Sequence, residues 1–182
     1  MTTTRDRLLE AAADLLYREG VNVGVDALCK AAGVSKRSMY LLFEDKDALI
    51  AASLDRSGPR YTAALLPPGG GTPRERVLHV FRRVQEVTAD PEHRGCPLVA
   101  TAVELKDPLH PASAVARRHK ATMTEFFRAE AAAAGVPDPD LLATQLTFVF
   151  DGATTWSVVR AEPLADQAVT TAATLLDAAG LR

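Results

Sequence analysis

The segment from Val25 to Phe43, VDALCKAAGVSKRSMYLLF, holds the pattern that decides the fold of this 182-residue chain. Apolar side chains recur at helical spacing on both sides of Gly33, and a glycine there lets the backbone turn sharply between two short helices. No acidic residue follows its second position, and its basic residues are Lys30, Lys36 and Arg37. The segment therefore predicts a helix-turn-helix whose second helix presents a short, cationic face that suits the major groove of DNA.

Helix signals extend from this segment toward both ends of the chain. A first helix is expected from about Thr4 to Glu19, and Asp45 can cap a fourth that begins at Lys46. Gly58-Pro59 is expected to kink or break that helix, because proline removes a hydrogen bond and clashes with the preceding turn. The run Pro67–Gly71 is a linker. Further helices are expected over about Thr72–Asp90, Pro97–Leu105, Ala112–Ala134, Asp138–Val159 and Pro163–Gly180. No segment is convincing as a strand, so we expect an all-α fold of about nine helices.

Composition limits the class of protein. The formal net charge is -2, so any affinity for DNA has to come from a local basic patch. The cysteines, Cys29 and Cys96, form no CxxC pair, which fits a reducing cytoplasm and neither a disulfide framework nor a zinc site. The N-terminus lacks the pattern of a signal peptide, and no apolar run has the length of a membrane span. We therefore expect a cytoplasmic protein.

The stretches LLEAAADLLYREG and VDALCKAAGVSKRSMYLLFEDKDALIAA resemble the N-terminal domain of the tetracycline-repressor (TetR) family of regulators. The matching features are Ala11-Ala12, Gly20, the turn Ala31–Ser35, Tyr40, Phe43, Lys46 and Leu49. The resemblance implies a helix-turn-helix DNA-binding domain over residues 1–48 and a helical ligand-binding and dimerisation domain over 49–182. It also implies a homodimer that binds a near-palindromic double-stranded operator and is released from it as a repressor by a small molecule.

The resemblance assigns DNA contacts to particular residues. Tyr40 matches a tyrosine that binds the DNA backbone, and Lys46 matches a phosphate contact at the start of the fourth helix. The complete set of expected DNA-binding residues is Ser35, Lys36, Arg37, Ser38, Tyr40 and Lys46. Gly24 and Leu42 depart from the family pattern, because they stand where a capping Thr or Ser and a polar contact are common.

The C-terminal half is expected to hold a ligand pocket and the dimer interface. The last two helices carry apolar and small residues that suit a four-helix interface between two chains. Aromatic and other apolar side chains can wall a pocket, and polar side chains in apolar helices must be paired or face a ligand. The expected ligand-binding residues are Phe81, Cys96, Glu104, His119, Met123, Phe127, Phe148 and Asp151. For Glu104 and Asp151 the alternative is that each bridges or caps neighbouring helices.

Other functions fit the sequence less well. The histidines at 79, 93, 110 and 119 have no zinc-ligand spacing, and neither a phosphate-binding glycine loop nor a GxSxG motif occurs, so we expect neither an enzyme nor a cofactor. A thiol-based redox sensor is one alternative, because Cys96 lies near a helix start with Arg94 close by. A protein-interaction module with a decayed helix-turn-helix is another, because Gly24 and Leu42 weaken the expected DNA contacts.

Overall fold

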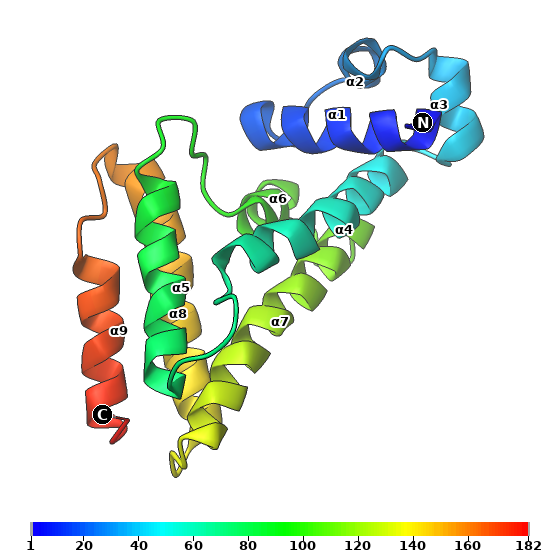
Figure 1. Ribbon diagram of the computed structural model, residues 1–182. Helices are drawn as coiled ribbons and strands as arrows, with labels where there is room; N and C mark the ends of the chain where they lie inside the picture. The colour runs from blue at the N-terminus through cyan, green and yellow to red at the C-terminus, as the bar shows by residue number, and fades with distance from the viewer. Residues whose placement is uncertain (1, 182) are drawn as a thin grey trace. The chain divides into compact units, whose positions relative to one another are not determined.

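The computed structural model describes residues 2–181, and their backbone forms α-helices without a strand (Figure 1). The helices are α1 (Thr4–Glu19), α2 (Val25–Ala32), α3 (Lys36–Leu42), α4 (Lys46–Leu65), α5 (Pro73–Thr88), α6 (Pro97–Leu105), α7 (Pro111–Ala133), α8 (Pro139–Arg160) and α9 (Gln167–Ala178). The all-α prediction is confirmed. No helix in this part of the chain combines the length and the apolar character that crossing a lipid bilayer requires.

Capping explains where most helices begin. Thr72 and Glu75 form the capping box expected at the start of α5, with Pro73 at the first helical position. Gly24 is the N-cap residue of α2, and because glycine has no side-chain oxygen, no side chain caps this helix. The last helix starts later than Pro163, the expected start, because Ala165 has φ +50°, a left-handed conformation that cannot belong to a right-handed helix. The helix therefore begins only at Gln167.

The fourth helix continues through Pro59, so of the kink or break expected at Gly58-Pro59 the break does not occur, and the kink stays a prediction. One missing hydrogen bond does not end a helix whose neighbouring side chains are buried, as Leu54 and Thr62 are. Gly58 has a packing reason instead. A Cβ at this position would lie 2.8 Å from Cδ2 of His119, so only glycine allows α7 to approach α4 so closely.

The contacts divide the chain into two compact units. The first comprises the described residues through Arg60 together with Pro97–His119, and the second comprises Tyr61–Cys96 together with the described residues from Lys120 onward. Both α4 and α7 contribute residues to each unit. These compact units do not correspond to the functional domains that the sequence predicts, and the domain boundary after residue 48 stays a prediction.

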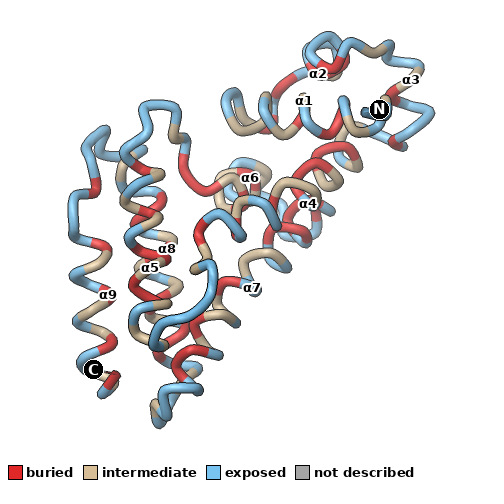
Figure 2. The backbone as a smooth tube through the Cα atoms, in the orientation of Figure 1, coloured by how far each residue is buried: buried red, intermediate tan, exposed pale blue. Residues whose placement is uncertain are grey.

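The first unit has its own apolar core, where α1, α2 and α3 meet. Leu8, Leu28, Met39 and Leu49 are at most 1% exposed, and they come from α1, α2, α3 and α4 in turn. Figure 2 shows the buried stripes on the inner sides of these helices. Burial of side chains of this size stabilises a fold by about 2 kcal/mol each, so the short helices α2 and α3 depend on this core.

The second unit is built around aromatic side chains. Its helices α5, α8 and α9 pack against one another, as Figure 1 shows. Phe81 and Phe127 stack with ring centroids 5.7 Å apart, and Phe150 meets Phe127 edge to face at 6.5 Å. All three side chains are at most 1% exposed. This unit therefore has a closed aromatic core.

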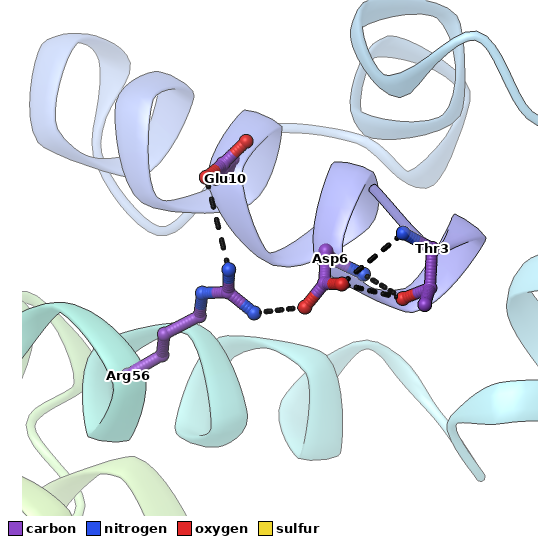
Figure 3. A network of polar contacts seen from close by, with 4 residues as sticks. All are labelled: Thr3, Asp6, Glu10 and Arg56. Carbon is purple, nitrogen blue, oxygen red and sulfur yellow. Dashed lines mark hydrogen bonds and ion pairs between the residues drawn. The ribbon is translucent and has the colours of Figure 1, made fainter. Parts of the chain in front are cut away.

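A polar network joins α1 to α4 within the first unit (Figure 3). The guanidinium of Arg56 on α4 binds the carboxylate of Asp6 and lies 3.7 Å from that of Glu10. Asp6 also accepts hydrogen bonds from the hydroxyl and the amide of Thr3, at 2.7 and 3.1 Å. The Thr3 hydroxyl and then the Arg56 guanidinium lower the pKa of Asp6 to about 2.

The Asp6 network predicts a pH dependence of stability. In the folded chain the pKa of Asp6 is about 2, below its ordinary value of 3.8. The ionised carboxylate therefore stabilises the fold, fully so above about pH 4. This stabilisation is lost as the pH falls from about 4 to about 2. We expect Asp6→Asn to remove that part of the pH dependence, measured by urea unfolding across this range. Asp14→Asn, at the exposed α1 aspartate that pairs with Arg18, is the matched control and should keep the wild-type profile. A profile for Asp6→Asn as steep as that of the wild type would contradict the assignment.

Candidate nucleic-acid interface

The turn between α2 and α3 is held by local hydrogen bonds. Gly33 adopts a left-handed conformation, φ +63° and ψ +41°, and its N–H donates to the carbonyls of Cys29 and Lys30. The Ser35 hydroxyl accepts a hydrogen bond from the Ser38 amide at 3.1 Å and so caps α3. Two of the predicted DNA-binding residues, Ser35 and Ser38, therefore form the N-terminal cap of this helix.

The two faces of α3 differ in character. Met39 is fully buried, and Phe43 at the end of the helix is 6% exposed, so this side holds α3 against the core. Lys36, Arg37 and Tyr40 are exposed, with Tyr40 at 53%. The predicted contact residues thus share the outward side of α3, where a groove of DNA could reach them.

Lys36 has a partner that the sequence did not reveal. Its ammonium lies 2.9 Å from a carboxylate oxygen of Asp26 on α2, and both side chains are more than half exposed. The hydrogen bond that Lys36 donates to Asp26 raises the pKa of the lysine, so it stays charged. An exposed pair of this kind contributes little to stability, so a phosphate can compete with Asp26 for the lysine. The pairing depends on the turn at Gly33, and residue spacing alone gives no signal for it.

Lys46 and Glu104, predicted for different sites, meet at one residue of the α1–α2 loop. The Lys46 ammonium donates a hydrogen bond to the Val21 carbonyl at 2.6 Å. Glu104 on α6 accepts one from the Val21 amide at 2.7 Å. Gly20 makes this approach possible, because a Cβ there would lie 2.4 Å from the same carboxylate oxygen. We call this arrangement the Val21 clamp, and it leaves Lys46 two further N–H donors.

Glu104 therefore does not face a ligand pocket in this structure, and the alternative that it bridges neighbouring elements describes it better. The same holds for the other polar side chains predicted for the pocket. His119 lies 2.8 Å from a carboxylate oxygen of Asp55 on α4, and Asp151 on α8 pairs with Lys120 on α7. Each of these three polar side chains thus has a partner within the protein.

Of the apolar residues predicted to bind ligand, three gather in one core and Phe148 does not join them. Phe81, Met123 and Phe127 are at most 3% exposed and fill the core of the second unit, whereas Phe148 is 71% exposed and walls nothing. Glu104 and His119 belong to the first unit and the others to the second. The apolar pattern of α8 continues on both of its faces, so periodicity does not separate the core side from the outer side, on which Phe148 lies.

Three hollows in the described residues lie elsewhere. A cavity of about 20 Å³, enough for one water molecule, lies among α1, α4 and α6 in the first unit. Open grooves of about 260 and 380 Å³ flank α8 in the second unit. None of the predicted ligand-binding residues lines any of these three hollows. The ligand-binding set stays a prediction.

Neither cysteine offers an accessible thiol. Cys29 is 4% exposed and Cys96 is 2% exposed, and neither forms a disulfide. Burial raises the pKa of the Cys29 thiol, which disfavours the reactive thiolate. The redox alternative is therefore not favoured. Within residues 2–181, no group of three or more His, Cys, Asp or Glu side chains could hold a metal ion.

Comparison with known proteins identifies the family. The family model for bacterial regulatory proteins of the tetR family matches residues 8–53. The crystal structure of a tetr-transcriptional regulator from Streptomyces avermitilis matches with a TM-score of 0.95 and 54% sequence identity, over 99% of this chain and 100% of that one. The chain belongs to the TetR family. The family match covers most of α1, all of α2 and α3 and the start of α4, and so includes the cationic face of α3 and, of the Val21 clamp, Val21 and Lys46.

Further TetR-family relatives share less sequence. The Escherichia coli protein named HTH-type transcriptional repressor NemR is 30% identical over 109 residues, which cover 57% of this chain and 55% of NemR. The chain thus spans about half the length of this curated relative. The crystal structure of reduced Escherichia coli NemR matches with a TM-score of 0.82 at 23% identity, over 94% of this chain and 95% of that one, and shows a common fold.

The Val21 clamp predicts a local effect of changing Glu104. Glu104→Ala leaves the Val21 amide without its acceptor, and we expect its hydrogen exchange to accelerate about fivefold, equivalent to about 1 kcal/mol. Glu104→Gln retains a carbonyl oxygen that can accept the same bond, so it should exchange more slowly than the alanine variant. Exchange measured by NMR on the full chain tests this. Equal rates in the wild type and Glu104→Ala would show that the carboxylate does not protect this amide.

Proposed function

We propose that this TetR-family chain is a ligand-responsive transcriptional repressor that binds a near-palindromic operator as a homodimer. The observation that carries the proposal is the two-sided character of α3: Met39 is buried, and Arg37 and Tyr40 are exposed on a helix without an acidic residue. Such a helix can enter the major groove while its basic side chains meet phosphates. The name of the relative NemR, a transcriptional repressor, supports repression.

The proposed DNA contacts are those of the sequence prediction. Arg37 and Tyr40 are free to reach bases and backbone, and Lys36 can exchange its exposed partner Asp26 for a phosphate. Lys46 can use its remaining donors on a phosphate while it holds Val21. The DNA-binding domain is proposed to comprise residues 1–48 and the ligand-binding and dimerisation domain residues 49–182. Because operator DNA lies in the bacterial cytoplasm, this function also places the protein there.

The outer face of α8 supports a homodimer. Leu141, Phe148 and Val159 are 54%, 71% and 74% exposed, and they follow one another at about two and three helical turns, so they lie on one face. Between Leu141 and Val159 the one charged residue is Asp151, which pairs with Lys120. Exposed apolar side chains on an uncharged face mark an interaction surface. A second copy bearing the same face would cover it and set two recognition helices at half-sites about 34 Å apart.

The effector is proposed to bind among the helices of the second unit. Phe81, Met123 and Phe127 belong to the core there and offer an apolar wall. The half-buried Lys120–Asp151 pair offers charged groups, and the Lys120 ammonium lies over the ring of Phe150, which meets Phe127. Because these side chains are packed together, binding would have to open the core. The ligand must bind the DNA-incompetent state more tightly than the competent one, since otherwise the equilibrium does not shift.

Binding to DNA from upstream of the chain's own gene tests the function. We expect the full chain to bind that duplex at least about a thousandfold more tightly than a scrambled duplex of equal length, because specific operator complexes exceed non-specific ones by this factor or more. Fluorescence anisotropy at fixed salt concentration measures both affinities. Equal affinities would remove the operator proposal and favour a protein-interaction module.

Salt dependence provides the control for this test. The logarithm of the affinity falls as the logarithm of the salt concentration rises. Arg37→Ala and Lys46→Ala should each make this slope shallower by about 0.9, if each residue neutralises one phosphate. Arg18→Ala, at an exposed arginine that pairs with Asp14 at the far end of α1, should leave the slope unchanged. An unchanged slope for Lys46→Ala would assign that lysine to the Val21 clamp alone.

The dimer proposal predicts the effect of one charge on α8. Phe148→Glu places a carboxylate in the proposed interface, where burial without a partner is costly, and we expect the dissociation constant to rise at least about a hundredfold. Sedimentation velocity then reports a monomer. Leu109→Glu is the matched control, since Leu109 is 89% exposed and lies in the first unit, and this variant should remain dimeric. A dimeric Phe148→Glu variant would exclude this face as the interface.

A further inference from the structure

Leu41 is an apolar side chain on a helix face that is otherwise polar. It is 78% exposed, although leucine is normally buried. It lies four residues after Arg37, so both project from the same side of α3. Met39, which anchors α3 in the core, is displaced from Leu41 by about 200° around the helix. Leu41 therefore points away from the core on the same side as Arg37, and folding of the first unit does not account for it.

The neighbour Leu42 differs in position and exposure. It is 41% exposed and lies about 100° from Leu41 around the helix, toward the side that carries Met39. Part of its surface is therefore covered by the protein itself. Of the two leucines, Leu41 is the one whose surface is left for a partner.

The chemistry of α3 restricts what that partner is. No acidic residue occurs on this helix, which ends before Glu44 and Asp45, and Lys36 and Arg37 precede Leu41 on it, so the face of the helix itself favours a polyanion. Within the major groove of DNA the base edges are polar except for one apolar group, the C5-methyl of thymine. A leucine cannot donate or accept a hydrogen bond, so this methyl is the base-edge group that it can recognise.

We propose that Leu41 is a specificity-determining residue that contacts the C5-methyl group of a thymine in each operator half-site. The inference rests on the proposed operator binding and deepens it, because it names a base that the operator must contain. Arg37, on the same face, then contacts a neighbouring base or phosphate. Removal of the thymine methyl and the Leu41 side chain from water supplies sequence preference without a hydrogen bond.

Uracil substitution isolates the methyl group, because uracil keeps the pairing and hydrogen-bonding edges of thymine and lacks only the C5-methyl. The probe is the duplex that the full-length wild-type protein enriches from a random-sequence library. Each thymine is replaced in turn by uracil, symmetrically in both half-sites, and affinities are measured by anisotropy at one salt concentration. We expect one position at which the affinity falls about fourfold for each methyl removed, or about 15-fold for both half-sites.

Variants assign that loss to Leu41. Leu41→Ala should bind the thymine and uracil duplexes equally, whereas the matched control Leu42→Ala should retain the wild-type difference. Leu41→Ala keeps the helix, because alanine is a stronger helix former and the leucine makes little contact with the core. Circular dichroism checks this, and the uracil series on the wild-type protein stands independently of any variant.

Two results would overturn the assignment. One is a wild-type protein that is insensitive to uracil at every thymine of a duplex that it does enrich. The other is a Leu41→Ala variant that keeps the full preference for thymine. Failure of the proposed function is distinguishable from both, since the wild-type protein would then enrich no sequence from the library.

Discussion

The burial of Met39 against the core of the first unit is the contact on which the structure of the candidate site depends. Met39 is fully buried, and it lies on a helix of only seven residues. A helix this short is not stable alone, because the cost of nucleating it is not recovered over so few hydrogen bonds. The apolar contacts of Met39 with α1 and α2 therefore hold α3 in place, and they decide which of its side chains face outward.

Polar contacts then define the loops around this core. The Val21 clamp satisfies both the amide and the carbonyl of one loop residue with side chains from α6 and α4. The Arg56 guanidinium binds the Asp6 carboxylate and so joins α4 to the start of α1. A buried backbone group without a partner is costly, so these side chains stabilise the positions that the apolar core alone leaves open. Glu104 thus contributes to the unit that carries the DNA-reading helix, through a hydrogen bond to Val21, which lies 83 residues before it in sequence.

In the second unit the core is filled by aromatic side chains, and further apolar side chains remain exposed on the surface. Its aromatic side chains Phe81, Phe127 and Phe150 form a closed core, and its polar groups pair locally. The apolar side chains that remain exposed, Phe148 and Val159 among them, gather on the outer face of α8. An interior that is filled and an outer face that is apolar and uncharged are what a unit that associates with its own copy requires.

The sequence by itself determined the helices, the turn at Gly33 and the cationic side of α3, because capping, glycine conformation and apolar period act over a few residues. It also carried the family resemblance that the comparisons support. Only the tertiary structure decided that Glu104 and Lys46 meet at Val21, that Lys36 pairs with Asp26, and that Phe148 faces outward while Phe127 is buried. Such pairings join residues that are distant in sequence, and an apolar pattern on both faces of a helix does not say which face is covered. They depend on the packing of whole helices, which local preferences do not specify.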